Sequence, residues 1–187
     1  IWLCVLFVGT GLAQGRSPVM LIKNMLPAYF TALGTMSSAA TIPVALQASK
    51  RNGVSDGIAN FTVPLCATIH LCGSTITLVT CATAVMFLSE HLAIPGYGTM
   101  VPFIMMLGVI MIAAPGAPGG GVMSALGLLT SMLGFGEASI ALMIALYLAQ
   151  DSFGTACNVT GDGVIALWAD RFAQSEAPLA APERDAA

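Results

Sequence analysis

Two long uncharged stretches constrain this chain more than any other feature of its sequence. No Asp, Glu, Lys or Arg occurs between Asp56 and Glu90, or between Glu90 and Glu137. A helix needs about 20 consecutive apolar residues to cross the hydrocarbon core of a bilayer, and each stretch is longer than that. The composition agrees, because charged residues make up 8% of the chain and apolar residues 57%, against about 25% and 45–50% in soluble domains. The sequence therefore predicts an all-α integral membrane protein.

Composition also excludes several other classes of protein. A net charge of −3 with six basic residues leaves no patch for a phosphate backbone, so no nucleic-acid partner is expected. The five cysteines form no CxxC pair and lie mostly in apolar runs, which indicates buried hydrophobic side chains rather than disulfides or a zinc site. The chain begins with an apolar run, residues 1–13, that lacks an initiator Met. We therefore expect these residues to be the end of an upstream transmembrane helix.

The rest of the chain divides into a core, 14–172, and a polar tail, 173–187, which is predicted to be disordered. Within the core the predicted segments are a hairpin at 24–49, a span at 61–88, a hairpin at 92–135 and a span at 138–170. Both hairpins are interrupted, the first by Pro27 and Pro43 and the second by PGAPGGG at 115–121. Because proline and glycine free backbone polar groups, such breaks must be buried in protein or line a cavity.

The positions of the basic residues favour hairpins that return to their own side of the membrane. Lys and Arg occur at 16, 23, 50, 51, 171 and 184, and none lies near Glu90 or Glu137. If both hairpins are re-entrant, all basic residues share one face, as the positive-inside rule requires. A single crossing by 24–49 would separate Arg16 and Lys23 from the basic pair at 50–51. The prediction is an inverted repeat with helix breaks near 37–40 and 115–121. The two tips are expected to approach each other beside the last helix, with a substrate and ion site at the repeat interface.

Four motifs then occur in the order and at the spacing of a known family. They are MSSAATIP (36–43), ATIHLCGST (67–75), GAPGGG (116–121) and QDSFGTACNVTGD (150–162). Over 21–172 the chain resembles the glutamate transporter family, the dicarboxylate/amino acid:cation symporters. The resemblance implies a re-entrant hairpin followed by a broken transmembrane helix, twice. It also implies a secondary active symporter that takes up a small carboxylated solute by alternating access, a homotrimer when full-length, and a multi-pass location in the cell membrane, here the bacterial inner membrane.

The resemblance assigns roles to residues of this chain. It places the substrate among Ser37, Ser38, Ala117, Gly121, Asp151, Thr155 and Asn158, with Asp151 on the substrate amino group. It places the coupling ion, sodium, on Asn158, Asp162 and the backbone carbonyls of Cys66 and His70, with no other cofactor. The residues themselves agree, because positions 151, 155, 158 and 162 fall on one stripe of a helix. A carboxylate at the centre of a membrane costs about 2.5–3.5 kcal/mol and needs partners, and oxygen ligands suit a hard cation.

Three departures from the family pattern bear on selectivity. Gly154 stands where members that carry acidic substrates have an arginine, and Met36 stands where some members have one. His70-Leu71-Cys72 replaces an Asn-Met-Asp run. Without a guanidinium, a second substrate carboxylate has no partner, so a neutral or hydroxy amino acid is the favoured substrate. An arginine at 154 is expected to shift the preference toward acidic amino acids. His70 is either a proton-responsive group, which would allow a proton as coupling ion, or a neutral hydrogen-bonded residue of the broken helix.

Parts of the sequence also fit two functions other than symport. A channel or structural module would use the glycine-rich tips as selectivity loops, but the two tips differ in sequence where a filter repeats symmetrically. An intramembrane enzyme would use Ser37 or Ser38 with His70 and Asp151, but no Gly-x-Ser-x-Gly run surrounds the serines. The chain is therefore not expected to be an enzyme.

Overall fold

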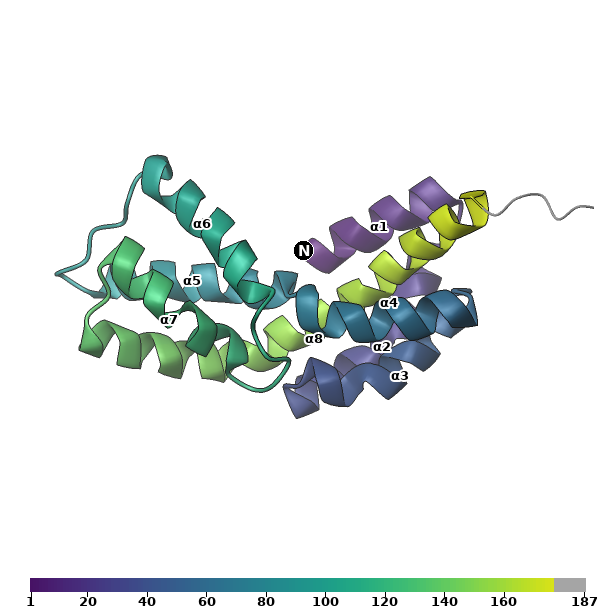
Figure 1. The fold of residues 1–187 in the computed structure, drawn as a ribbon, viewed down its shortest axis with the longest axis horizontal. Coiled ribbons are helices and arrows are strands. Elements are labelled where there is room, and N and C mark those ends of the chain that lie inside the picture. The colour runs from purple at the N-terminus through teal and green to yellow at the C-terminus, as the bar shows by residue number, and fades with distance from the viewer. Residues whose placement is uncertain (177–187) are drawn as a thin grey trace, which may run out of the picture.

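The computed structural model describes residues 1–176, and this part of the chain is helical throughout, without a strand (Figure 1). The helices are α1 (Trp2–Gln14), α2 (Pro18–Thr35), α3 (Ser38–Arg51), α4 (Asp56–Ile69), α5 (Cys72–Leu88), α6 (Tyr97–Met111), α7 (Gly120–Leu133) and α8 (Glu137–Glu176). The prediction of an all-α architecture is confirmed. Two helical stretches, Asp56–Leu88 and Glu137–Ser175, are long and apolar enough to cross a membrane.

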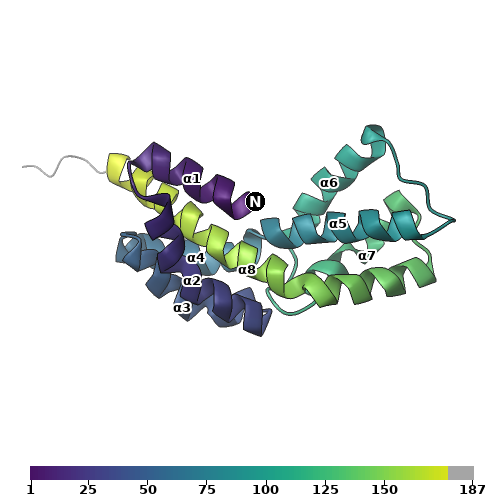
Figure 2. The same cartoon turned by 180° about the vertical axis from the view of Figure 1, so that it is seen from behind.

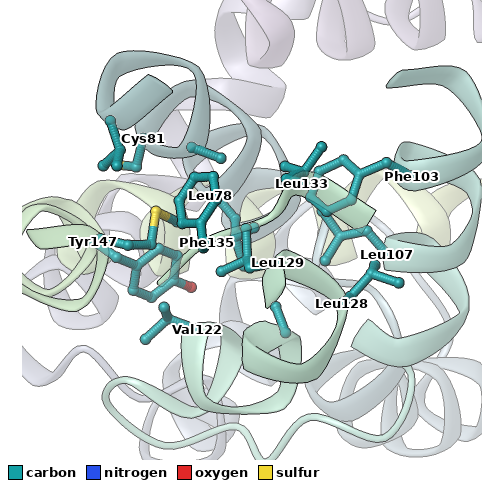
Figure 3. Close-up of a cluster of buried hydrophobic side chains, with 14 of the residues drawn as sticks. Leu78, Cys81, Phe103, Leu107, Val122, Leu128, Leu129, Leu133, Phe135 and Tyr147 are labelled. Atoms are coloured by element: carbon teal, nitrogen blue, oxygen red, sulfur yellow. The ribbon is translucent and has the colours of Figure 1, made fainter. Parts of the chain in front are cut away.

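The helices form two groups along α8, which runs the length of the molecule (Figures 1 and 2). Helices α5 and α7 pack against its first half, with α6 packed on α5 and α7, and α1 to α4 pack against its second half. Each group buries its own apolar core: Phe103, Leu129 and Tyr147 belong to the first (Figure 3), and Phe7 and Leu167 to the second. The middle of α8 lies between the two cores, which leaves room there for polar residues.

The first hairpin consists of α2 and α3, which pack against each other. Ser17 caps α2, whose first residue is proline, a residue suited to that position because its missing N–H needs no partner there. Met36 ends α2 in the left-handed conformation, with φ of 51°, and Ser37 caps α3. The break therefore lies at residues 36–37, one position earlier than the predicted 37–40.

The second hairpin consists of α6 and α7, joined by an irregular segment at 112–119. The predicted break, Pro115–Gly121, is displaced by a few residues, because α7 begins at Gly120 and the turns after α6 begin at Ile112. No side-chain cap holds the start of α7, where Gly119 takes φ of 74°. Glycine adopts this conformation without the steric cost that other residues have.

The two predicted spans differ in continuity. The first is broken, because α4 ends at Ile69 and α5 begins at Cys72. The second is not: α8 continues without interruption from Glu137 to Glu176, so the prediction of a broken helix in both halves is wrong for this one. The sequence of α8 contains no proline, and its internal glycines weaken a helix by only about 1 kcal/mol each, which packing offsets. Helix α8 also extends past residue 173, where the disordered tail was predicted to begin, so residues 173–176 are helical. The rest of the predicted tail, 177–187, lies outside the described residues.

Three basic residues make contacts at one end of the molecule. Arg16 donates to the Asn52 carbonyl, Arg171 donates to the Ala13 carbonyl, and Lys50 pairs with Asp56 at 3.0 Å. The loops at 89–96 and 134–136, which adjoin the predicted acidic junctions, lie at the opposite end (Figure 1). This is the distribution of charge on which the topology prediction depends.

Candidate functional site

Asp151 is the buried carboxylate at the centre of the candidate site. It lies midway along α8 with 4% of its surface exposed. Its Oδ2 accepts a hydrogen bond of 2.7 Å from the backbone N–H of Gly119, at the end of the irregular segment between α6 and α7. Burying a charge away from water is costly unless it is paired. A single N–H is a small compensation for a carboxylate, so Asp151 retains capacity to accept from a ligand.

The tips of the two hairpins meet beside Asp151. Ser37 Oγ donates to the Gly116 carbonyl at 2.9 Å, and the Ala39 N–H approaches the same carbonyl at 3.5 Å. The Ser37 hydroxyl also accepts from the Ala40 N–H at 3.2 Å, so one side chain both caps α3 and contacts the other hairpin. The expectation that the two tips approach each other next to the last helix is confirmed.

A small cavity of about 10 Å³ lies between the two tips, α5 and α8. A volume of this size holds about one water molecule. Its walls bring together all but one of the predicted substrate residues, and none of the lining residues is Lys or Arg: Met36, Ser38, Leu71, Ser74, Pro115, Gly116, Ala117, Gly121, Tyr147, Asp151, Thr155 and Asn158. The exception is Ser37, which lies at the contact between the tips. The roles assigned to these residues stay predictions.

Two polar residues of the cavity wall were missed in the sequence. Tyr147 precedes Asp151 by one helical turn, so the stripe that groups positions 151, 155 and 158 also includes it, and extending the stripe would have found it. Ser74 belongs to α5 and contacts the cavity only because α5 packs against α8. No local pattern marks it.

Asn158 is engaged with the start of α5. Its Oδ1 accepts from the N–H groups of Gly73 at 2.7 Å and Ser74 at 3.2 Å, and its Nδ2 donates to Ser74 Oγ at 2.8 Å. Helix α5 has no capping side chain of its own, since Leu71 precedes it. Asn158 therefore performs from α8 the function of an N-cap, satisfying donors that the helix cannot satisfy itself.

Asp162 pairs with the histidine of the helix break. His70 Nδ1 lies 2.8 Å from Asp162 Oδ1, and the Asp162 side chain is 1% exposed. The Cys66 carbonyl accepts from the His70 N–H at 2.8 Å as the last bond of α4. Three of the oxygens predicted to bind the cation, those of Cys66, Asn158 and Asp162, thus have protein partners here. In residues 1–176 no group of three or more His, Cys, Asp or Glu residues gathers as a metal site.

The contacts of His70 also bear on the enzyme hypothesis. His70 contacts Asp162, whereas Asp151 accepts from Gly119 and Ser37 donates to Gly116. Nucleophilic catalysis by serine requires the base within hydrogen-bond reach of the hydroxyl and a third group that orients the base. Ser37, His70 and Asp151 therefore each contact a different partner, and these contacts do not connect a nucleophile to a base and an orienting group.

Gly154 faces α5 instead of the cavity. A Cβ on Gly154 would lie 3.1 Å from Thr77 Oγ1 and 3.2 Å from the Ser74 Cα, and Gly154 is not part of the cavity wall. The residue therefore lets α8 and α5 approach closely. A larger side chain at 154 would press on α5, and the shift of preference toward acidic substrates expected from an arginine there stays a prediction.

Residues 1–176 form an all-helical fold in which two stretches are long and apolar enough to cross a membrane. Residues 1–172 match the sodium:dicarboxylate symporter family, and the chain belongs to that family. It is 31% identical to human excitatory amino acid transporter 1 over 155 residues, and this match covers 82% of this chain and 28% of the relative. It is 30% identical over 173 residues to mouse excitatory amino acid transporter 4, covering 90% of this chain and 30% of the relative. An excitatory amino acid transporter of Caenorhabditis elegans is 30% identical over 154 residues, 80% of this chain and 29% of the relative.

The chain spans less than a third of the length of these relatives. The trimer implied by the resemblance and the bacterial inner membrane stay predictions.

Proposed function

We propose that this chain is the substrate-binding core of a sodium-coupled symporter that takes up a neutral or hydroxy amino acid by alternating access. The observation that carries the proposal is the meeting of two hairpin tips, Ser37 on Gly116, over the buried carboxylate of Asp151. Symporters of inverted-repeat design place their substrate between such interrupted segments, near the bilayer midplane. The hairpins are proposed to be re-entrant, each returning to its own side.

The chemistry of the cavity wall supports an amino acid that carries no side-chain charge. Asp151 is the wall's acidic group and can pair with the substrate ammonium, while backbone N–H groups at the first tip can bind its carboxylate. No basic side chain is among the residues that line this cavity. A second carboxylate would be buried without a partner, which disfavours it by several kcal/mol.

Transport requires the tips to separate, because the cavity of about 10 Å³ is too small for an amino acid. A closed cavity that opens by moving a hairpin is the behaviour of a carrier, whereas a channel needs a continuous path. We propose that separating Ser37 from Gly116 exposes Asp151.

The decisive experiment uses the full-length protein in liposomes, with uptake driven by an inward sodium gradient. Serine, threonine and alanine are expected to be taken up far better than aspartate or succinate. Asp151→Asn should reduce uptake at least tenfold, because the ammonium loses its charged partner. Asp170→Asn is the matched control: Asp170 is also buried on α8, but its carboxylate accepts from Ser55 and Gln174, away from the cavity. Preferential uptake of aspartate or succinate would contradict the proposed substrate class.

The coupling ion has its own test. Asp162→Asn should raise the sodium concentration needed for half-maximal uptake, because it removes a formal charge from a hard-cation site. Because His70 already contacts Asp162, uptake is measured with a proton gradient as well. Uptake driven by protons alone, with no response to sodium, would show that sodium is not the coupling ion.

A further inference from the structure

The hydroxyl of Tyr147 is a buried polar group without a hydrogen bond. Tyr147 is 1% exposed, and no partner with acceptable geometry satisfies its hydroxyl within the described chain, although Ser74 and Asp151 lie beside it. The ring belongs to the apolar cluster around Val122, where Figure 3 shows it with the phenolic oxygen in red. Buried tyrosine hydroxyls usually find a partner, so an unpaired one that lines a cavity is available to bond a ligand.

The hydroxyl reaches the same cavity as Asp151. Tyr147 and Asp151 are one turn apart on α8, and both line the cavity between the hairpin tips. Gly121 makes room for the phenol, since a Cβ at that position would lie 2.5 Å from the hydroxyl oxygen. If Asp151 pairs with the substrate ammonium, the Tyr147 hydroxyl beside that carboxylate is within reach of a short side chain on the same substrate.

We propose that Tyr147 is the residue that selects the substrate side chain, by hydrogen-bonding to a hydroxyl group on it. The substrate is then a small hydroxy amino acid such as serine. This inference rests on the proposed function and narrows its substrate class. A phenol is uncharged and both donates and accepts one bond, so it complements a hydroxyl group. It cannot neutralise a second carboxylate, and an apolar side chain would leave its hydroxyl unpaired.

Selectivity of this kind comes from the penalty on the wrong ligand. A site built to bond a hydroxyl rejects the analogue that lacks it, because the buried group of the protein then has no partner. The appropriate pair of ligands is serine and 2-aminobutyrate, which differ by a hydroxyl and a methyl group of similar size. We expect wild type to take up serine with a kcat/KM about tenfold or more above that of 2-aminobutyrate, the value of one net hydrogen bond.

The test compares the full-length wild type with Tyr147→Phe in sodium-driven uptake by liposomes. Phenylalanine keeps the ring that packs in the cluster and removes only the oxygen. The ratio of serine to 2-aminobutyrate kcat/KM should fall about tenfold in the variant. Tyr97→Phe is the matched control, because Tyr97 is 88% exposed at the start of α6, and its ratio should equal that of wild type.

The possible results separate this inference from the proposed function. No sodium-driven amino acid uptake by wild type overturns the proposed function and the inference with it. Uptake with the same ratio in wild type and Tyr147→Phe overturns the inference alone. A second measurement does not depend on the variant: serine should raise the thermal unfolding temperature of wild type more than 2-aminobutyrate at equal concentration. Equal stabilisation by the two ligands overturns the inference.

Discussion

The two hairpin tips meet at one cavity but are built in different ways. The first is two residues long, and its own side chains hold it: Ser37 caps α3, and Thr41 donates to the Ser37 carbonyl at 2.8 Å. The second spans 112–119, has no side-chain cap on α7, and is tied to α8 by the bond from Gly119 to Asp151. Local sequence thus specifies the first tip, whereas tertiary contacts hold the second.

The arms of the two hairpins differ in the same direction. Helices α2 and α3 both pack against α8, and α3 also packs against α4. Helix α6 packs against α7 and α5, and it exposes large apolar side chains along its length: Tyr97, Val101, Ile104, Met105, Met106 and Val109. Elements with fewer buried contacts open at lower free energy. We therefore expect the second tip to be the one that moves when the cavity opens.

The largest effect should follow removal of the carboxylate that holds the second tip. Asp151→Ala deletes a hydrogen bond to a charged acceptor, worth about 1.5–3 kcal/mol, so amide exchange across 112–119 should accelerate roughly 10- to 100-fold. Exchange at 36–41 should change little, because Ser37 and Thr41 hold that tip locally. Hydrogen exchange read by mass spectrometry measures both segments in one experiment. Equal acceleration at both tips would refute the distinction between them.

A smaller effect is expected from the left-handed residue of the second tip. Gly119→Ala forces a Cβ into φ of 74° and within 3.0 Å of Leu148, at a cost of about 1–2 kcal/mol. Gly127→Ala is the control, because Gly127 lies inside α7 with no heavy atom within 4 Å of a Cβ, where alanine gains about 0.5–1 kcal/mol. Thermal unfolding in detergent should lower the midpoint for the first variant and raise it for the second. A lowered midpoint for both variants would show that the loss of stability comes from changes to α7 in general and not from the left-handed conformation of Gly119.

The link between the tips can be tested at Ser37. Ser37→Ala removes the N-cap of α3, at about 1 kcal/mol, together with the bond to the Gly116 carbonyl. Exchange should increase at both tips. Ser17→Ala removes the cap of α2, whose hydroxyl accepts from Met20, and should affect that helix end alone. If Ser37→Ala left 112–119 as protected as in wild type, the contact between the tips would have no energetic role.

The smallest effect concerns the one non-glycine residue with positive φ in residues 1–176. Met36 adopts φ of 51° at the end of α2, a conformation that disfavours side chains. Met36→Gly should raise the stability of the first hairpin by about 0.5 kcal/mol, because relief of the steric cost exceeds the added chain entropy. The midpoint of thermal unfolding measures it. A loss of stability would show that the Met36 side chain contributes more by packing at the cavity than its backbone costs.

Much of the fold follows from local chemistry. The uncharged stretches, the basic residues near one end and the glycine-rich run at 115–121 were enough to predict helices and their order. Pro27 and Pro43, which were expected to interrupt the first hairpin, lie inside α2 and α3. The hairpin breaks were displaced by only a few residues, because caps such as Ser37 depend on atomic detail. The continuity of α8 was predicted incorrectly, since internal glycines are tolerated where packing on both sides supports the helix.

The candidate site was determined partly by sequence and partly by tertiary structure. Helical spacing places Asp151, Thr155 and Asn158 on one stripe, so the sequence by itself brings them together. The tertiary structure alone decided that Asn158 caps α5, that His70 reaches Asp162 and that Gly154 faces α5. These contacts join residues from separate helices, and their partners depend on how close two backbones approach, a distance that no local periodicity encodes.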